Sequence, residues 1–343
     1  MAEATPMFEA RGLVRHFDVS RPLLQRLLAR EGRRTLRAVD GVSFAIPKGT
    51  TLSLVGESGC GKSTVARLAV GLYAPSAGSV LFDGRDLAEA RGRADQRRRM
   101  QMIFQDPYAS LNPRWRVADI IAEPLRAFGL VSSRGERESR VAELLTQVGL
   151  SPLDGQKFPH EFSGGQRQRI SIARALSSKP EFLVCDEPTS ALDVSVQAQI
   201  LNLMKELQQR FGLTYLFISH NLAVMRQVSD RVGVMYLGRL AELAPAESLF
   251  RRPRHPYTRA LMEAIPDLEM TGRERIPVGG EVPSPITPPP GCAFHPRCPL
   301  AQERCRRERP EMKPAGDALV ACHAVEEGRD DAMPMPRLAR DAA

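Results

Sequence analysis

The chain has 343 residues, of which 43% are hydrophobic and 26% charged, and its 48 Lys and Arg against 40 Asp and Glu give a formal net charge of +8. This length allows one large domain with an appendage, or two domains, with a sizeable core. The positive excess is compatible with nucleic acid, anionic lipid or nucleotide, but over this length it is too small to indicate a nucleic-acid-binding protein. No run of about 18 apolar residues occurs, so no transmembrane helix is predicted.

The start of the chain contains Glu3 and Glu9 and lacks the charged-then-apolar pattern of a signal peptide. We therefore expect a cytosolic protein that is at most peripheral to a membrane. The densest basic cluster lies between Arg91 and Arg99 and has no interleaved aromatic residues. Such a cluster is more typical of a solvated face than of a nucleic-acid site.

The first elements in the chain are two predicted strands, Met7–Val14 and Ala38–Ile46, with a turn at 47–49. Between the strands, Leu23–Arg30 has helical apolar spacing and predicts a short surface helix. Phe17 precedes this insert, and its ring is equally compatible with a core position and with stacking on a nucleotide base.

A glycine-rich loop follows the next apolar run, Thr51–Val55, and leads into a predicted helix. The loop is Gly56-Glu57-Ser58-Gly59-Cys60-Gly61-Lys62-Ser63-Thr64, which matches G-x-x-x-x-G-K-[ST] completely. Its glycines allow the backbone N–H groups to point inward, and the helix adds its positive N-terminal end. Lys62 would supply charge to the β- and γ-phosphates, and Ser63 an oxygen ligand for Mg²⁺. The pattern favours a phosphate-binding loop over a glycine-rich turn without a ligand.

Helical apolar spacing then runs from about residue 108 to 178, after the predicted strands Ser79–Gly84 and Met100–Pro107. Within it, Ser163-Gly164-Gly165-Gln166 opens a long helix and offers bare backbone N–H groups to an anion.

Two later strands end in residues suited to a phosphate site. The apolar strand Glu181–Pro188 ends in Asp186 and Glu187, so both acids are expected at the carboxyl ends of the strands, where α/β sheets bind ligands. An acid there can hold Mg²⁺ while the next residue faces the γ-phosphate, and a solvated acidic loop is the weaker alternative. Thr214–His220 is a second apolar strand with a polar side chain at its end, although His220 alone would be interpreted as a structural histidine.

The composition changes from Arg251 onward, through a proline-rich segment, a cysteine cluster and a tail from Glu326 that is expected to be disordered. Cys60 and Cys185 lie in the nucleotide motifs, whereas the clustered cysteines are Cys292, Cys298, Cys305 and Cys322. In a reducing compartment, such clustering favours a metal over disulfides. Four thiolates suit a [4Fe–4S] cluster or Zn²⁺ equally in number, and the wide spacings lean against zinc. His295 or His323 could replace a cysteine, and four unligated thiols remain the alternative.

These motifs together resemble the ATP-binding-cassette family. The family's order is matched by the phosphate loop, Gln105, Ser163 to Gln166, Asp186-Glu187, Ser190-Ala191-Leu192-Asp193 and His220. More narrowly, the chain resembles the ATPase subunit of a dipeptide/oligopeptide importer, on the basis of Ser110–Pro113, Asp193–Gln199, His255–Thr258 and the stretch from Pro283 to Pro299. The resemblance covers roughly residues 7 to 323 and is closer to the F-type than to the D-type member of the usual subunit pair.

The resemblance implies an α/β fold of the P-loop NTPase class. It comprises a RecA-like core with an antiparallel β subdomain in residues 7–250, an α-helical subdomain at about 106–178, a C-terminal extension of the oligopeptide-transporter type at 251–325, and a disordered tail at 326–343.

The resemblance also implies roles for individual residues. Glu187 would be the general base, His220 the γ-phosphate contact, and Gln105 the link from metal and water to the helical subdomain. Phe17 would stack on the base, although the insert at 18–37 departs from the family pattern. The expected Mg²⁺ ligands are Ser63, Gln105 and Asp186, and the expected ATP contacts are residues 56–64, Ser163, Gly164, Gly165, Gln166 and Asp193. A [4Fe–4S] cluster, with Zn²⁺ as the alternative, would be held by Cys292, Cys298, Cys305 and Cys322.

The implied function is ATP hydrolysis that drives peptide uptake. Because Ser163 to Gly165 would touch ATP held by the opposing subunit, the implied partners are a second, D-type ATPase subunit, two membrane permeases and an extracytoplasmic solute-binding protein, at the cytoplasmic face of the plasma membrane. The alternatives are import of nickel or glutathione and, as a different class, a nucleic-acid-associated or ribosome-associated cassette ATPase. The former usually carries a long coiled coil or a zinc insertion, and the latter carries two cassettes in one chain, whereas here there is one.

Overall fold

The structure is a computed structural model that describes residues 6–22, 25–26, 32–89, 93–264 and 279–336. Its centre is an eight-stranded sheet with the strand order β11-β12-β10-β9-β3-β8-β7-β6. The strands are β3 (Thr51–Val55), β6 (Met100–Ile103), β7 (Phe182–Asp186), β8 (Thr214–Ser219), β9 (Arg231–Tyr236), β10 (Arg239–Pro245), β11 (Lys313–Ala315) and β12 (Ala318–Val320). Strands β6, β7, β8, β3 and β9 are parallel. Every residue of β3, β7 and β8 is buried, as expected for a parallel sheet covered on both faces.

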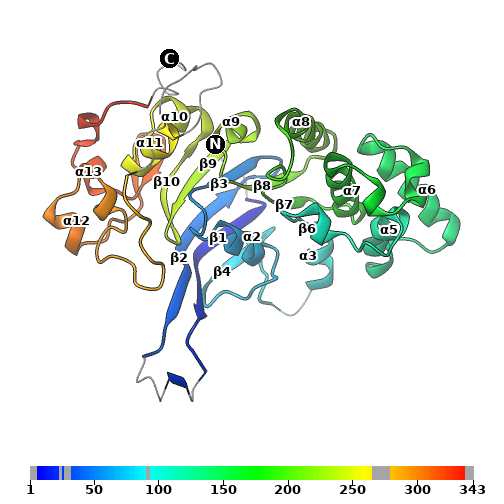
Figure 1. The fold of residues 1–343 in the computed structure, drawn as a ribbon, viewed down its shortest axis with the longest axis horizontal. Helices are drawn as coiled ribbons and strands as arrows, with labels where there is room; N and C mark the ends of the chain where they lie inside the picture. The colour runs from blue at the N-terminus through cyan, green and yellow to red at the C-terminus, as the bar shows by residue number, and fades with distance from the viewer. Residues whose placement is uncertain (1–5, 23–24, 27–31, 90–92, 265–278, 337–343) are drawn as a thin grey trace.

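A second, antiparallel sheet has the order β2-β1-β4-β5, from β1 (Phe8–Asp18), β2 (Thr35–Ile46), β4 (Ala77–Phe82) and β5 (Arg85–Asp86). Strands β1 and β2 are longer than the predicted strands because their pairing continues to Asp18 opposite Thr35. The two form a hairpin that projects from the body (Figure 1). Of the predicted surface helix, only Gln25 and Arg26 are described, and both are helical.

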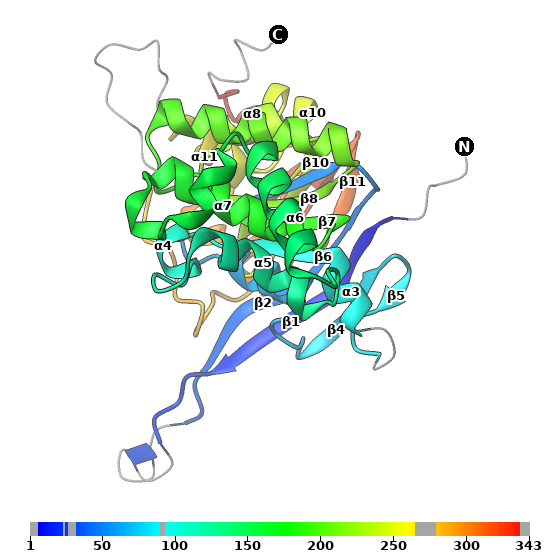
Figure 2. The same ribbon diagram turned by 90° about the vertical axis from the view of Figure 1, so that its right-hand side faces the viewer.

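The helices form layers around the central sheet. Those near the sheet are α2 (Lys62–Ala69), α3 (Arg93–Arg99), α8 (Val194–Phe211) and α9 (Leu222–Val228). A separate helical part contains α4 (Pro107–Ser110), α5 (Val117–Ala127), α6 (Arg134–Gln147) and α7 (Gly164–Ser177). Figure 1 shows this part at one end of the molecule and the C-terminal region at the other, and Figure 2 looks onto the molecule from the helical end. The arrangement confirms the predicted RecA-like core with an antiparallel β part and a helical part.

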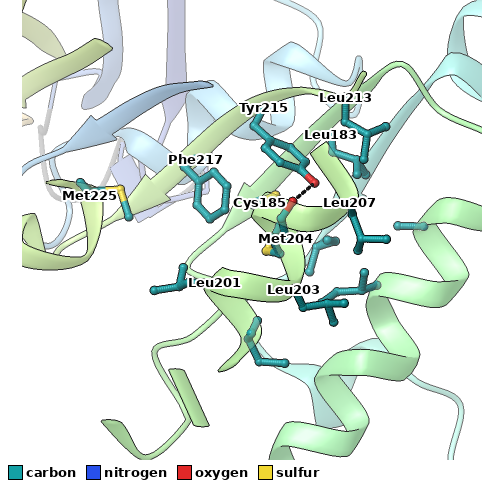
Figure 3. Packing of buried hydrophobic residues seen from close by; sticks show 14 of the residues in the cluster. Leu183, Cys185, Leu201, Leu203, Met204, Leu207, Leu213, Tyr215, Phe217 and Met225 are labelled. Carbon is teal, nitrogen blue, oxygen red and sulfur yellow. Dashed lines mark hydrogen bonds between the residues drawn. The ribbon is translucent and has the colours of Figure 1, made fainter. Parts of the chain in front are cut away.

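The packing of α8 on the sheet shows how the core is held together (Figure 3). Leu203, Met204 and Leu207 of α8 belong to the same buried cluster as Leu183 of β7 and Tyr215 of β8. The Tyr215 hydroxyl would otherwise be a buried donor without a partner, and it donates to the Met204 carbonyl oxygen at 2.9 Å. Burial raises the pKa of Tyr215 well above its usual value, so the hydroxyl stays protonated. The first halves of β7 and β8 are thereby held against α8.

The C-terminal region contains α10 (Ala246–Arg251), α11 (Pro256–Glu263), α12 (Glu303–Arg307) and α13 (His323–Glu326). Strand β12 pairs with β10, so this region joins the central sheet. Part of the tail expected to be disordered also has structure, because Asp330 is buried and its carbonyl and carboxylate oxygens accept hydrogen bonds from Arg259. Within the described residues, no helix is long and apolar enough to span a bilayer.

Candidate active site

The glycine-rich loop lies between β3 and α2, in contact with β2 and the β9–β10 turn. A Cβ atom on Gly56 would lie 2.2 Å from the Met235 carbonyl oxygen, and one on Gly61 would lie 2.1 Å from that of Ala38. Both glycines also have positive φ angles, +153° and +107°. The N–H of Gly238 donates to the Cys60 carbonyl oxygen at 2.9 Å. Only glycine fits at both positions, so close contact with the surrounding backbone determines the conformation of the loop.

The side chain of Lys62 lies inside this loop. Its ammonium group donates to the carbonyl oxygens of Gly56 and Glu57 at 2.7 and 2.9 Å, and it is 3.6 Å from the Cys60 Sγ atom. Ser58 and Gly59 form the exposed outer turn, whereas Thr64 lies in the first turn of α2. A fixed ammonium beside a helix N-terminus makes the loop chemically suited to bind an anion such as phosphate.

The hydroxyl of Ser63 and the carboxylate of Asp186 meet at the carboxyl end of β7. Ser63 Oγ donates to Asp186 Oδ1 at 2.9 Å, and Asp186 is 3% exposed. Burial raises the pKa of Asp186, the Ser63 hydrogen bond opposes that shift, and the neighbouring Glu187 adds to it. Two hard oxygen donors in contact beside a phosphate loop fit Mg²⁺ chemically. Gln105, predicted as a further ligand, donates its amide to Glu187 instead.

Two predicted site residues, Gln105 and His220, converge on an oxygen of a third, Glu187 Oε2. Gln105 Nε2 donates to it at 3.0 Å, and His220 Nδ1 lies 3.2 Å from it. The three residues follow the neighbouring strands β6, β7 and β8. Glu187 has a φ of +47°, which is rare for a residue with a Cβ, and its N–H donates to the Ile218 carbonyl oxygen at 3.0 Å. The backbone thus holds a strained conformation that directs the carboxylate toward these partners.

The motif Ser163 to Gln166 begins α7 with a reciprocal cap, because the Gln166 N–H donates to Ser163 Oγ at 3.4 Å and the Ser163 N–H donates to Gln166 Oε1 at 3.0 Å. A Cβ on Gly165 would lie 2.5 Å from Val196 Cγ1, so the motif packs closely on the start of α8. No hydrogen bond among the described residues joins this motif to the phosphate loop, and α7 and α2 are well separated in Figure 1. One chain therefore does not bring the two halves of the predicted site together.

Two further predicted contacts lie outside this cluster. Phe17 is half-buried on β1, its ring 5.6 Å from that of Tyr73 and 4.6 Å from the Arg15 guanidinium carbon. It pairs with Leu36 on β2, two residues before Ala38, whose carbonyl closes on the phosphate loop. Asp193 is exposed at the start of α8. Base stacking by Phe17 and nucleotide contact by Asp193 stay predictions.

The four clustered cysteines are neighbours in the fold. The Cys292 N–H donates to the Cys305 carbonyl oxygen at 2.8 Å. Burial raises the pKa of Cys292 to about 11 and that of Cys298 to about 12, and charge on the other thiols adds to each shift. Yet the described residues contain no group of three or more His, Cys, Asp or Glu placed to hold a metal ion. The donors suit the predicted cluster in type and neighbourhood, but the geometry does not support it.

The predicted substitutes for a cysteine have other contacts: His295 Nδ1 lies 2.9 Å from the Cys292 carbonyl oxygen, and His323 Nε2 lies 3.1 Å from that of Glu308. Sequence reasoning missed Arg297 and Tyr257, both of which reach Glu57 in the phosphate loop. Tyr257 stood only inside the motif His255–Thr258, and a local motif gives no sign of such a distant partner.

Comparisons with known proteins agree with this geometry. The family profile "ABC transporter" matches residues 39–190, and the profile "Oligopeptide/dipeptide transporter, C-terminal region" matches residues 241–305. The oligopeptide transport ATP-binding protein AppF of Bacillus subtilis is 51% identical over 94% of this chain and 98% of its own length. The di/tripeptide transport ATP-binding protein DppF of Pseudomonas aeruginosa is 52% identical over 93% and 97%. The ATP-binding cassette MJ0796, solved as a dimer with ADP and Pi, has a TM-score of 0.61 and 26% identity over 70% of this chain and 99% of its own.

Proposed function

Because this chain belongs to the ABC transporter family, as an ATP-binding subunit of the oligopeptide/dipeptide type, we propose that Glu187 and its neighbours perform the ATP hydrolysis that drives peptide import. The observation that carries the proposal is the convergence of Gln105 and His220 on Glu187 Oε2, beside the Ser63–Asp186 pair. The site therefore presents a carboxylate base, a polar contact for phosphate and two oxygen donors at the end of one phosphate loop.

Each group has a separate part in this mechanism. The loop N–H groups and Lys62 bind the triphosphate, and Ser63 and Asp186 would hold Mg²⁺, which would neutralise charge on the phosphate oxygens when bound. Glu187 accepts a proton from the attacking water, and Gln105 orients that carboxylate from the side of the helical part. His220 is the contact for the γ-phosphate, Phe17 stacks on the base, and Asp193 lies beside the nucleotide of the closed assembly.

A complete site requires a second ATPase subunit. The separation of Ser163 to Gln166 from the phosphate loop of the same chain supports a sandwich in which this motif contacts ATP bound by the partner. The dimeric structure of the ATP-binding cassette MJ0796 is consistent with such pairing. We propose a D-type partner, and hence a heterodimer, because the motifs of this chain are those of the F-type subunit.

The transport complex would contain two permease subunits and an extracytoplasmic solute-binding protein, with this chain peripheral at the cytoplasmic face of the membrane. Peptides are favoured over nickel or glutathione because the relatives reported above are named as oligopeptide and di/tripeptide transport proteins. The relatives reported above give no support to the alternative of a nucleic-acid-associated ATPase.

Purification of the intact complex from membranes tests this function. We expect the chain to copurify with two permeases and a second ATPase, and ATP hydrolysis by the reconstituted complex to rise when peptide and the binding protein are added. Stimulation by nickel or glutathione but not by peptide would contradict the assignment of the solute. A chain that copurifies with nucleic acid and with no permease would contradict the transport function.

For the C-terminal cysteines, we propose one metal centre, with a [4Fe–4S] cluster first and Zn²⁺ second. The proposal is supported by the proximity of four thiols in a region with little apolar core of its own. A bound metal would cross-link such a region. The thiolates of Cys292, Cys298, Cys305 and Cys322 would be the ligands, after side-chain rearrangement from the described geometry. The role would be structural.

Metal analysis of anaerobically purified chain checks this proposal. We expect brown protein with about four irons per chain. The double variant Cys298→Ser/Cys322→Ser should lose the metal, whereas Cys60→Ala, which changes a cysteine outside the cluster, should retain it. One equivalent of zinc in colourless protein would contradict the iron–sulfur assignment, and metal-free protein with four titratable thiols would contradict the site altogether.

A further inference from the structure

We propose that the C-terminal region sets the ATP affinity of the phosphate loop by holding Glu57, with Arg297 as the principal positioning residue. The inference rests on the proposed ATPase function, and it adds a connection that the phosphate-loop motif does not contain. Glu57 and Arg297 are 240 residues apart in the sequence.

The contact between the two side chains is a two-pronged ion pair. Arg297 Nη1 donates to Glu57 Oε2 at 2.8 Å, and Nη2 donates to Oε1 at 3.0 Å. The Arg297 side chain is 2% exposed and that of Glu57 is 24% exposed. A guanidinium that engages both oxygens of a carboxylate fixes the direction of that carboxylate as well as its distance. Solvent screening of this pair is weak because the arginine is buried.

Arg297 is itself fixed on the side away from the loop. Its Nε donates to the Gly279 carbonyl oxygen at 3.0 Å, and its guanidinium carbon lies 5.8 and 5.9 Å from the ring centroids of Tyr236 and Phe294. The rings of Tyr236, Tyr257 and Phe294 form a triangle with centroid separations of 4.7 to 5.3 Å. The triangle joins the end of β9 to α11 and to the cysteine-bearing segment, so the arginine is presented from a rigid base.

A second contact reaches the same loop residue through its backbone. The Glu57 N–H donates to the Tyr257 hydroxyl oxygen at 3.0 Å. The Glu57 carbonyl oxygen accepts from Lys62 Nζ at 2.9 Å. The residue held by the C-terminal region is therefore the residue whose carbonyl helps to place the ammonium group that would meet the phosphates. Loss of these contacts to Glu57 would therefore allow both the phosphate loop and the Lys62 ammonium group to move from their positions.

The test is a double-mutant cycle on the full-length chain with Mg²⁺ and AMP-PNP as the probe. We expect Arg297→Gln and Glu57→Gln each to weaken AMP-PNP binding about tenfold, and the double variant to bind no more weakly than either single variant, because contacting residues are coupled. Arg297→Lys should recover part of the affinity. In the assembled complex, the Arg297 variants should raise KM for ATP and leave kcat nearly unchanged, a split that general loss of stability would not produce.

Arg304→Gln is the matched control, because Arg304 lies on α12 and pairs with Glu308 and Glu327 at the surface. It should bind AMP-PNP like the wild-type chain. Should Arg297→Gln fail to fold, Glu57→Gln and Arg297→Lys carry the test. Wild-type affinity in these variants, or losses that add in the double variant, would overturn the inference. A wild-type chain that binds no AMP-PNP would contradict the proposed ATPase function and so remove the premise.

Discussion

The variant Glu187→Gln is expected to bind ATP nearly as well as the wild-type chain and to slow hydrolysis by the assembled complex by ~10²–10⁴. A neutral amide cannot accept the proton of the attacking water. It has almost the size of the carboxylate, however, and one amide oxygen can still accept the Gln105 hydrogen bond. Glu and Gln are equally unfavourable in the left-handed backbone conformation of this position, so the exchange should not change the backbone. The effect should therefore fall on the chemical step.

Single-turnover ATP hydrolysis and equilibrium nucleotide binding separate the two effects. Glu143→Gln is the matched control, since it makes the same exchange on the exposed surface of α6, where Glu143 pairs with Arg140. It should hydrolyse ATP at the wild-type rate. Near-normal turnover by the Glu187→Gln complex would remove Glu187 from the role of base.

The variant Gly164→Asp is expected to leave ATP binding by this chain intact and to reduce hydrolysis by the complex about a hundredfold or more. A Cβ at Gly164 would meet only Leu192 Cδ2, at 3.3 Å, so the fold should accommodate it. An acid in the first helical turn of α7 is favourable for the helix itself. In the proposed sandwich, however, its carboxylate would place negative charge beside the backbone donors that face the partner's phosphates.

Gly135→Asp provides the matched control for this experiment. Gly135 also lies in the first turn of an exposed helix, α6, and nothing lies within 4 Å of a Cβ built there. The control complex should hydrolyse ATP normally. If the isolated chain hydrolyses ATP as fast as the assembled complex, or if Gly164→Asp lowers its own ATP affinity, the shared site is wrong.

The sequence predicted which polar side chains would lie together because they belong to local motifs at strand ends. Parallel strands end at the same side of a sheet, so Gln105, Glu187 and His220 had to meet once their strands were identified. The contact of Ser63 with Asp186 follows from the same rule. The roles of these residues remain predictions, since geometry alone does not measure a proton transfer.

The C-terminal region was the least predictable part. Strands β11 and β12 have three residues each, too few to show an alternating pattern, and a proline-rich stretch precedes them. Their place is decided by the pairing of β12 with β10 and of β11 with β12. The Arg297–Glu57 pair likewise depends on the tertiary fold, which brings together residues far apart in the sequence. The long β1–β2 hairpin was underestimated because its outer half alternates weakly and is mostly exposed or half-buried. These features are determined by tertiary contacts, which the strand propensity of a local sequence does not reveal.

The pairing of β12 with β10 has a consequence for how the C-terminal region could be lost. Leu243 of β10 pairs with Leu319, and Glu242 pairs with Val320. A chain cut before Lys313 would leave β10 as a bare outer strand, with unpaired N–H and C=O groups and a buried apolar sequence open to any other strand. Proteolysis in this region would therefore turn a sheet that is covered along β10 into a template for self-association. A chain shortened in this way should therefore aggregate even where it still binds nucleotide.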